Sequence, residues 1–272
     1  MTSIDIRYCE ALITSAGEGL YEASARKERA ASAEGLFEQF REENDTATKA
    51  IKTGLAEKYP HIRWSESEFD ISSQSAAEFQ GEYWVCDAID GAVQFLQGIP
   101  SYAINLCLIR DGKPALSFVY DPSHRDMFHA IAGEGAFWNG NRIHVARKKK
   151  LEDAIISTTP PSFPAKDREL ANLTIAGLTH LLPRAFAVRM LGSASLQLAN
   201  VACGRIDGYY EFGHEYYNWI AGSLLVQEAG GVVTAPRGDE FTWGTSGIIA
   251  ANRDIRQQMQ EGMQAIPYVT HS

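Results

Sequence analysis

Four β-like runs follow one another between residues 83 and 131, and they constrain the fold more than any other feature. They cover residues 83–86, 101–110, 115–120 and 127–131, with turns such as Asp111-Gly112 between them. Short connections rich in glycine, proline or aspartate typically join neighbouring antiparallel strands. The sequence therefore predicts an antiparallel sheet in the first half of the chain.

Two helices are predicted ahead of this sheet. Apolar residues recur at helical spacing over residues 3–27, which predicts an amphipathic helix. A second helix is predicted to begin near Asp45, which would act as its N-cap, and to end at Tyr59-Pro60. Residues 61–65 then form a short predicted strand that places Glu66 at its C-terminal end.

The pattern changes in the second half of the chain, after the basic run 147–150, which is interpreted as a solvated linker. Helices are predicted over 193–202 and 218–229, and strands over 206–210, 232–233 and 248–251. An antiparallel first half thus meets an alternating α/β second half. We expect the two halves to cover residues 1–146 and 147–272.

Composition excludes several classes of function. The 272 residues carry a net charge of −9, which argues against a nucleic-acid or anionic-membrane surface. No window approaches eighteen apolar residues, and the N-terminus does not resemble a signal peptide. The four cysteines have neither metal-binding nor CxxC spacing and indicate buried thiols in a reducing compartment. These features favour a cytoplasmic protein.

Three acidic residues fall at the ends of predicted strands. Glu66 follows one strand, and Asp87 and Asp90 end the apolar run WVCDAIDGAVQF at residues 84–95. With the carbonyl of Ile89, they form a set of hard oxygen ligands of the kind that suits Mg²⁺. A plain turn with a helix cap also explains an isolated Asp-x-x-Asp-Gly, so the spacing alone leaves both interpretations open.

Gly91 and Ala92 directly follow these acids and are predicted to begin a helix. Free backbone N–H groups at a helix N-terminus favour a phosphate. A metal beside such a phosphate would indicate phosphoryl chemistry, in which the metal polarises the phosphate and activates water.

The chain resembles the inositol monophosphatase family of Mg²⁺-dependent phosphomonoesterases. That family carries a Trp-x-x-Asp-Pro-hydrophobic-Asp-Gly-Thr-x-Asn-Phe signature, which the segment 84–95 matches at most positions. Farther on, LGSASLQLANVACGRIDGYYEFG and the stretch from Tyr217 to EAGG at 228–231 are similar to later family motifs. The correspondences run in order from about residue 4 to residue 252.

The resemblance implies a layered αβαβα sandwich and assigns roles by position. Asp45 and Glu66 are the implied catalytic residues. The implied metal ligands are Glu66, Asp87, Ile89, Asp90 and Asn218, and the implied substrate-binding residues are Gly91, Ala92, Ser193, Ala194 and Glu211. The family further implies Mg²⁺, with Mn²⁺ as a substitute, a small phosphorylated substrate and a homodimer.

Three departures from the family pattern fall inside the implied site. Ala88 replaces a proline and spares every ligand. Ala92 replaces a threonine whose hydroxyl helps to orient the attacking water, a loss that costs about 10²–10⁴-fold in rate for a positioned acid–base group. Asn218 replaces an aspartate ligand, and the loss of one negative charge weakens a hard-cation site. His214, Glu215 or Asp207 could compensate for it.

Two functions therefore remain open from the sequence. The first is a Mg²⁺-dependent phosphomonoesterase acting on an inositol phosphate, a sugar phosphate or a nucleotide 3′-phosphate. The second is a non-catalytic or regulatory family member that binds a ligand or protein partner. The stretch HEYYNW at 214–219 is rich in aromatic residues and has two interpretations. Its rings could stack on a planar substrate, or they could belong to the core or to a dimer contact.

Overall fold

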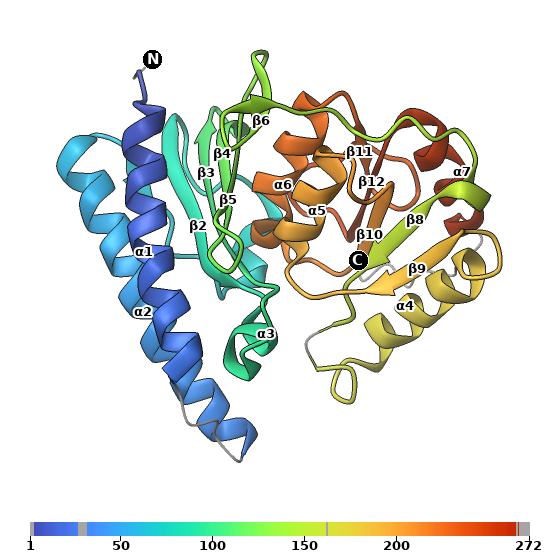
Figure 1. Ribbon diagram of the computed structural model, residues 1–272, viewed down its shortest axis with the longest axis horizontal. Coiled ribbons are helices and arrows are strands. Elements are labelled where there is room, and N and C mark those ends of the chain that lie inside the picture. The colour runs from blue at the N-terminus through green and yellow to red at the C-terminus, as the bar shows by residue number, and fades with distance from the viewer. Residues whose placement is uncertain (1–2, 27–31, 162, 265, 267–272) are drawn as a thin grey trace.

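The protein is a stack of five layers (Figure 1). This computed structural model describes residues 3–26, 32–161, 163–264 and 266. Helices α1 and α2 form the first layer, a sheet the second, helices α5 and α6 the third, a further sheet the fourth, and helices α4 and α7 the last. The predicted αβαβα sandwich is confirmed. No helix among the described residues is long and apolar enough to cross a membrane.

The first layer confirms one helix as predicted and corrects the start of the other. Helix α1 covers Ile6–Arg26 and α2 covers Ala33–Lys58, while residue 27 lies outside the described residues. Ser32 caps α2, since its side chain accepts a hydrogen bond from the Gly35 N–H at 3.1 Å. The predicted start at Asp45 is therefore wrong, and Asp45 lies in the middle of the helix.

The second layer is the predicted antiparallel sheet, seven strands long within the described residues. Its strands pair in chain order, and all neighbours are antiparallel except β1 and β2. Their bounds are β1 Arg63–Trp64, β2 Glu82–Asp90, β3 Ala103–Arg110, β4 Lys113–Asp121, β5 Asp126–Ile131, β6 Gly135–Trp138 and β7 Asn141–Arg142. A 3-10 turn, η1 (Ile71–Ser75), lies between β1 and β2, and the short helix α3 (Ala92–Gln97) follows β2.

A bulge in β2 decides where its acidic residues point. Asp87 pairs with Asn105 and Asp90 pairs with Ala103, so one extra residue of β2 lies opposite β3. Side chains alternate along a regular strand, and residues three apart would lie on opposite faces. Because of the extra residue, Asp87 and Asp90 instead share the face that packs on the middle layer.

The fourth layer is a mixed sheet with the order β11-β12-β10-β8-β9. Its strands are β8 Ile155–Thr158, β9 Ala187–Met190, β10 Gly208–Phe212, β11 Val232–Thr234 and β12 Gly247–Ala251. A second 3-10 turn, η2 (Leu151–Asp153), leads into it, and α4 (Arg168–Leu181) and α7 (Arg253–Met263) cover its outer face. The sequence predicted β10, β11 and β12 but none of the other elements named here.

The middle layer joins the two sheets. Helices α5 (Ala194–Ala202) and α6 (Tyr216–Glu228) are buried along most of their length, and both agree with the predicted helices. Their side chains form one core cluster with residues of both sheets. Tyr216, Tyr217 and Trp219 belong to this cluster and pack around Trp243 or Phe241. The core interpretation of HEYYNW is therefore confirmed.

The basic run after β7 is partly anchored to the second sheet. Lys148 pairs with the buried Asp207, which also accepts the N–H of Ile155 at 2.7 Å. Asn252 donates to the carbonyls of Ala146 and Lys148 at 2.8 Å. The division at 146–147 stays a prediction, since it falls in this connecting segment while the core cluster draws on both halves.

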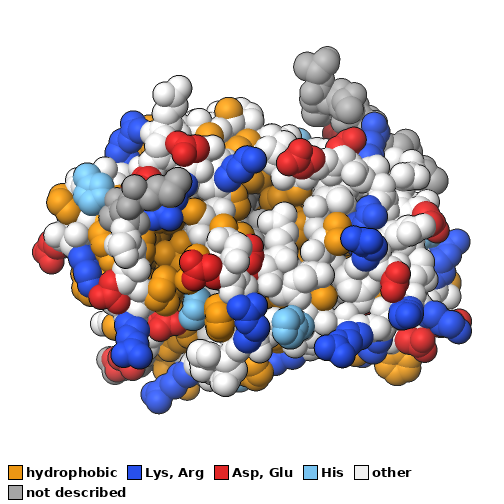
Figure 2. Space-filling model, turned by 90° about the horizontal axis from the view of Figure 1, so that it is seen from above, with side chains coloured by type: hydrophobic (Ala, Val, Ile, Leu, Met, Phe, Trp, Pro, Cys, Tyr) orange, Lys and Arg blue, Asp and Glu red, His pale blue; other side chains and the backbone are white. Residues whose placement is uncertain are grey.

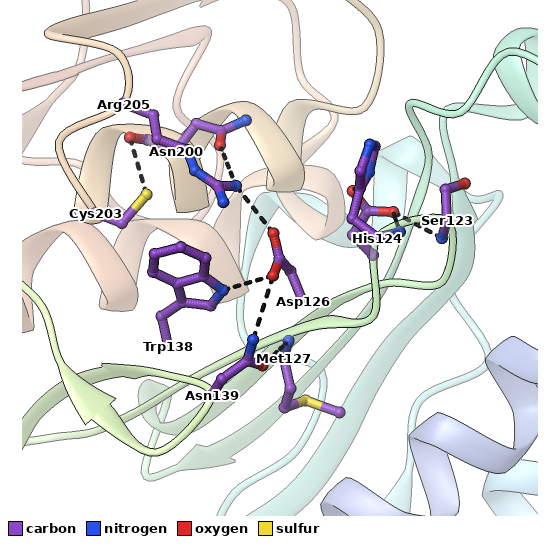
Figure 3. A network of polar contacts seen from close by, with 10 residues as sticks. Ser123, His124, Asp126, Met127, Trp138, Asn139, Asn200, Cys203 and Arg205 are labelled. Carbon is purple, nitrogen blue, oxygen red and sulfur yellow. Dashed lines mark hydrogen bonds and ion pairs between the residues drawn. The ribbon is translucent and has the colours of Figure 1, made fainter.

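A polar network around Asp126 holds the β5–β6 hairpin against the end of α5 (Figure 3). The buried carboxylate of Asp126 accepts hydrogen bonds from Trp138 Nε1 at 2.8 Å and from Asn139 Nδ2 at 3.3 Å. Arg205, just after α5, adds an ion pair at 3.0 Å and lies over the Trp138 ring. One carboxylate thus ties the first sheet to the middle layer.

We expect Asp126→Ala to destabilise the protein by about 2 kcal/mol, because it removes a buried acceptor from the half-buried Trp138 indole and from the more exposed Asn139 and Arg205. Urea unfolding followed by circular dichroism would measure the change. Glu152→Ala is the matched control, since Glu152 forms an exposed pair with Lys150 and its loss costs about 0–1 kcal/mol. Equal losses in the two variants would contradict the role given to the network.

Candidate metal and phosphate site

Asp87 and Asp90 lie buried at the C-terminal end of β2. Burial raises the pKa of both carboxyls, and the nearby charge of Glu68 raises that of Asp87 further. Asp87 Oδ1 accepts the N–H of Ile89 at 3.0 Å, which closes the turn across the bulge. The strand therefore holds two carboxylates together on one face, as the sequence predicted.

Asp90 is tied to the N-terminus of α5 in the other half of the chain. Its Oδ2 accepts hydrogen bonds from Ser193 Oγ at 3.0 Å, Ser195 N at 2.7 Å and Ser195 Oγ at 2.5 Å. Ser193 also caps α5, because its Oγ accepts the Leu196 N–H at 3.3 Å. These hydrogen bonds lower the pKa of Asp90 against the larger effect of burial. The structure thus brings Ser193 and Ala194 to Asp90, and their part in substrate binding stays a prediction.

Glu66 does not join this cluster. Its side chain is 70% exposed and pairs with Lys52 of α2. Glu68, two residues later, is the acid that faces Asp87, and burial raises its pKa to about 8. The chain runs irregularly between β1 and η1, so the position after the strand did not indicate which glutamate points inward. The structure thus does not place Glu66 with Asp87 and Asp90, and Glu68 lies there in its stead.

Asp45 also lies outside the cluster, and the preceding residue, Asn44, lies inside it. Asp45 is exposed, whereas Asn44 is 1% exposed and donates from Nδ2 to Glu68 Oε1 at 3.2 Å. Asn44 lies three residues before the buried Ala47 and seven before Ile51, on the inner face of α2. This helical spacing was visible in the sequence and would have identified position 44. The residue that touches Glu68 is therefore a neutral amide.

Gly91 and Ala92 follow the acids directly. Gly91 has φ +97°, and a Cβ there would lie 3.1 Å from the Ser101 carbonyl and from the Ser193 Cβ. Only glycine fits such a left-handed turn against neighbouring backbone. Ala92 begins α3, which confirms the predicted helix start beside Asp90.

Glu211 lies buried on β10 with a fixed orientation. Its Oε2 accepts hydrogen bonds from Tyr209 Oη and Trp219 Nε1, both at 2.5 Å. Burial and the charge of Glu215 raise its pKa well above the ordinary value. Asp90 acts on it in the same direction, so Glu211 faces the same cluster from the second sheet.

Asn218 lies in the first turn of α6, and Glu215 immediately precedes that helix. Asn218 Nδ2 donates to Glu215 Oε2 at 3.1 Å. Burial and the charge of Asp90 raise the pKa of Glu215. Of the three residues that could compensate for Asn218, Glu215 is thus the one that faces the acids, since His214 is exposed and Asp207 pairs with Lys148.

The side-chain amide of Asn105 lies beside the cluster without a hydrogen-bond partner among the described residues. Asn105 is the cross-strand partner of Asp87 and is fully buried. Neither its Nδ2 nor its Oδ1 has a hydrogen-bond partner among the described residues. Residues opposite each other on neighbouring strands share a face, so this amide lies beside Asp87. A polar group with unmet hydrogen bonds fits a site for a polar ligand.

The donor set suits a hard divalent cation. It comprises the carboxylates of Glu68, Asp87, Asp90 and Glu215 with the Ile89 carbonyl, all oxygen ligands of the type that Mg²⁺ prefers. Among the described residues, no three Asp, Glu, His or Cys side chains are gathered closely enough to bind one ion as they stand. The composition of the site therefore fits Mg²⁺, while binding requires these side chains to move towards one another.

The layered fold and the cluster of buried carboxylates at its centre define the class of protein as an αβαβα sandwich. The family model described as "Inositol monophosphatase family" matches residues 6–268. The chain belongs to the inositol monophosphatase family.

Relatives and solved structures agree with this assignment. The putative Nus factor SuhB of Neisseria meningitidis serogroup B is 34% identical over 245 residues, covering 90% of this chain and 92% of that protein. Nus factor SuhB of Escherichia coli K12 is 32% identical over 225 residues, covering 81% and 83%. The extragenic suppressor protein suhB from Bartonella henselae superposes with a TM-score of 0.79 at 28% identity, covering 95% and 98% of the two chains. The IMPase of Thermotoga maritima gives a TM-score of 0.80 at 25% identity, covering 95% and 96%.

The raised pKa of Glu68 predicts how the stability of the metal-free protein depends on pH. The folded state keeps Glu68 protonated up to about pH 8, whereas the unfolded chain ionises it near pH 4.5. The folded state thus binds more protons in this window, so stability falls as the pH rises through it. Glu68→Gln stays neutral throughout and should lose less stability between pH 5.5 and 8.5.

Melting temperatures in a chelating buffer across this pH range would measure the effect. Glu66→Gln is the matched control and should follow the wild-type curve, because Glu66 is largely exposed and outside the cluster. A flatter curve for Glu66→Gln than for Glu68→Gln would reverse the assignment of the two glutamates.

Proposed function

We propose that this protein is a Mg²⁺-dependent phosphomonoesterase that hydrolyses a small phosphorylated alcohol. The observation that carries the proposal is the bulge in β2, which turns Asp87 and Asp90 to one face where Glu68 joins them. Buried acids without a basic partner destabilise a fold, and a divalent cation is the partner that such a donor set accepts. Membership of the inositol monophosphatase family supports the same reaction class.

Each part of the site has a role in this proposal. Glu68, Asp87, Asp90 and the Ile89 carbonyl hold Mg²⁺, or Mn²⁺ in its place. The cation neutralises charge on the phosphate and lowers the pKa of water. The backbone at Gly91 and Ala92 receives the phosphate, next to the N-terminus of α3.

The alcohol side of the substrate lies towards the second sheet. Ser193 and Ala194 border it from α5, and Glu211 accepts hydrogen bonds from a substrate hydroxyl. Tyr209 and Trp219 fix one oxygen of Glu211 and leave the other for the substrate. This arrangement suits a polyhydroxylated alcohol such as an inositol phosphate or a sugar phosphate. A nucleotide 3′-phosphate has less support, because the nearby aromatic rings are buried in the core.

Water activation is the weak part of the site. Asn44 donates a hydrogen bond to Glu68 and cannot accept a proton as a carboxylate does. Ala92 has no hydroxyl, and Asp45 is exposed. We therefore propose slow turnover.

Asn44, Ala92 and Asn218 favour a second function, which is the non-catalytic binding of a ligand or a protein partner. Relatives that bear the name Nus factor SuhB add weight to it. On the face seen in Figure 2, acidic and basic side chains are intermingled, and the net charge is −9. We accordingly propose a protein or small-molecule partner over a nucleic acid for this second function.

The family also implies a homodimer, and the edge strand β9 offers a surface for it. Phe186, Met190 and Leu191 on and beside this strand are exposed. We propose a cytoplasmic dimer, because all four cysteines are free thiols, which suits a reducing compartment. Size-exclusion chromatography with light scattering would measure the oligomeric state.

The phosphatase proposal predicts phosphate release from a panel of inositol phosphates, sugar phosphates and nucleotide 3′-phosphates in millimolar Mg²⁺ or Mn²⁺. Chelation should abolish it, and Asp87→Asn should reduce it below detection, because both remove the means of binding the cation. Asp239→Asn, at an exposed position in the segment between β11 and β12, is the matched control and should keep wild-type activity. Wild-type protein that releases no phosphate from any compound would leave the binding function standing.

Restoring the water-activating pair should raise activity. Asn44→Asp combined with Ala92→Thr is expected to increase kcat by about 10²–10⁴-fold, the usual contribution of a positioned acid–base group. Steady-state kinetics on the best substrate would measure the gain. Ala92→Thr alone is the control, and a similar gain there that is lost on adding Asp45→Asn would return the role to Asp45.

A further inference from the structure

Position 215 carries a carboxylate that the reaction described above does not use. Glu215 lies at the start of α6, with its backbone carbonyl bonded to the Asn218 N–H at 3.1 Å. It is mostly buried, and its electrostatic neighbours are Asp87, Asp90, Asp167 and Glu211. A buried acid among other acids, with only an amide as hydrogen-bond partner in the described contacts, costs stability unless a cation compensates for it.

Glu215 and Asn218 form a pair across one helical turn. Residues three apart lie on the same face of a helix, and Asn218 Nδ2 donates to Glu215 Oε2 at 3.1 Å. An aspartate at position 218 would instead place a like charge beside Glu215. The neutral amide of Asn218 therefore avoids this repulsion, and its hydrogen bond orients the Glu215 carboxylate.

We propose that Glu215 is a metal ligand in this chain and replaces the carboxylate that position 218 lacks. The inference rests on the proposed Mg²⁺ site. The glutamate side chain is one methylene longer than aspartate, it starts three residues before position 218, and the charge of Asp90 acts on it. Asn218 acts as a positioning residue, and its amide oxygen stays available to the same ion.

This exchange conserves the charge of the site. Affinity for a hard cation depends strongly on the number of carboxylate ligands. Glu68, Asp87, Asp90 and Glu215 together supply four negative charges, whereas the first three alone supply three. The site thus regains through Glu215 the charge that the amide at 218 removes.

Manganese binding by the purified, chelator-treated protein tests the inference without any substrate. Titration calorimetry would give the affinity, and electron paramagnetic resonance of free Mn²⁺ would give the number of ions bound. Wild type should bind Mn²⁺, and Glu215→Gln should weaken that binding at least about tenfold or remove one ion per chain. Glu215→Gln/Asn218→Asp should recover affinity to within about threefold of wild type, because the carboxylate returns to position 218.

The controls separate a ligand from a structural residue. Glu240→Gln changes an exposed glutamate in the segment between β11 and β12 and should bind Mn²⁺ as wild type does. Without metal, Glu215→Gln should melt at or above the wild-type temperature, since it removes a buried repulsive charge. With Mn²⁺, it should gain less thermal stability than wild type.

The outcomes distinguish this inference from the proposed function. Equal affinity and ion number in wild type and Glu215→Gln would overturn the role of Glu215 and leave the Mg²⁺ site intact. A failure of Asn218→Asp to restore binding in the Glu215→Gln background would overturn the exchange between the two positions. Wild type that binds no Mn²⁺ at millimolar concentration would overturn the metal site itself.

Discussion

The hydrogen bonds between Asp90 and the N-terminus of α5 are the interaction on which the rest of the site depends. Asp90 comes from the first sheet, and Ser193 and Ser195 come from the second half of the chain. All three bonds go to one carboxylate oxygen, Asp90 Oδ2. The same residue therefore positions α5 and, in the proposed function, also contributes charge to the cation site. Packing of the two halves against each other therefore also brings the residues of the candidate site together at Asp90.

Much of this architecture could be predicted from sequence, and the errors have a common physical cause. The spacing of apolar residues and the turn residues between them identified the first sheet, α1, α5 and α6. The family motif identified Asp87 and Asp90. The direction of a side chain in an irregular segment could not be predicted. Between β1 and η1, Glu66 points to solvent and Glu68 is buried. The inner face of α2 was predictable, but the assumed start at Asp45 concealed that Asn44 belongs to it.

The elements missed in the second half were short or locally ambiguous. Strands β8 and β9 have four residues each, too few for alternation to be recognised. Strand β8 takes its place by pairing with β10, about fifty residues later in the chain, and β9 takes its place by pairing with β8. In the site, the substitution at 218 was visible in the sequence, but the direction of Glu215 depended on how α6 begins against the acids.

The dual use of Asp90 changes what its presence in a sequence means. An aspartate that only bound a metal would be free to change once catalysis was no longer under selection. Here its replacement would also break the buried junction between β2 and α5, so folding alone requires it. A relative of this protein that has lost all phosphatase activity should therefore still carry an aspartate at this position.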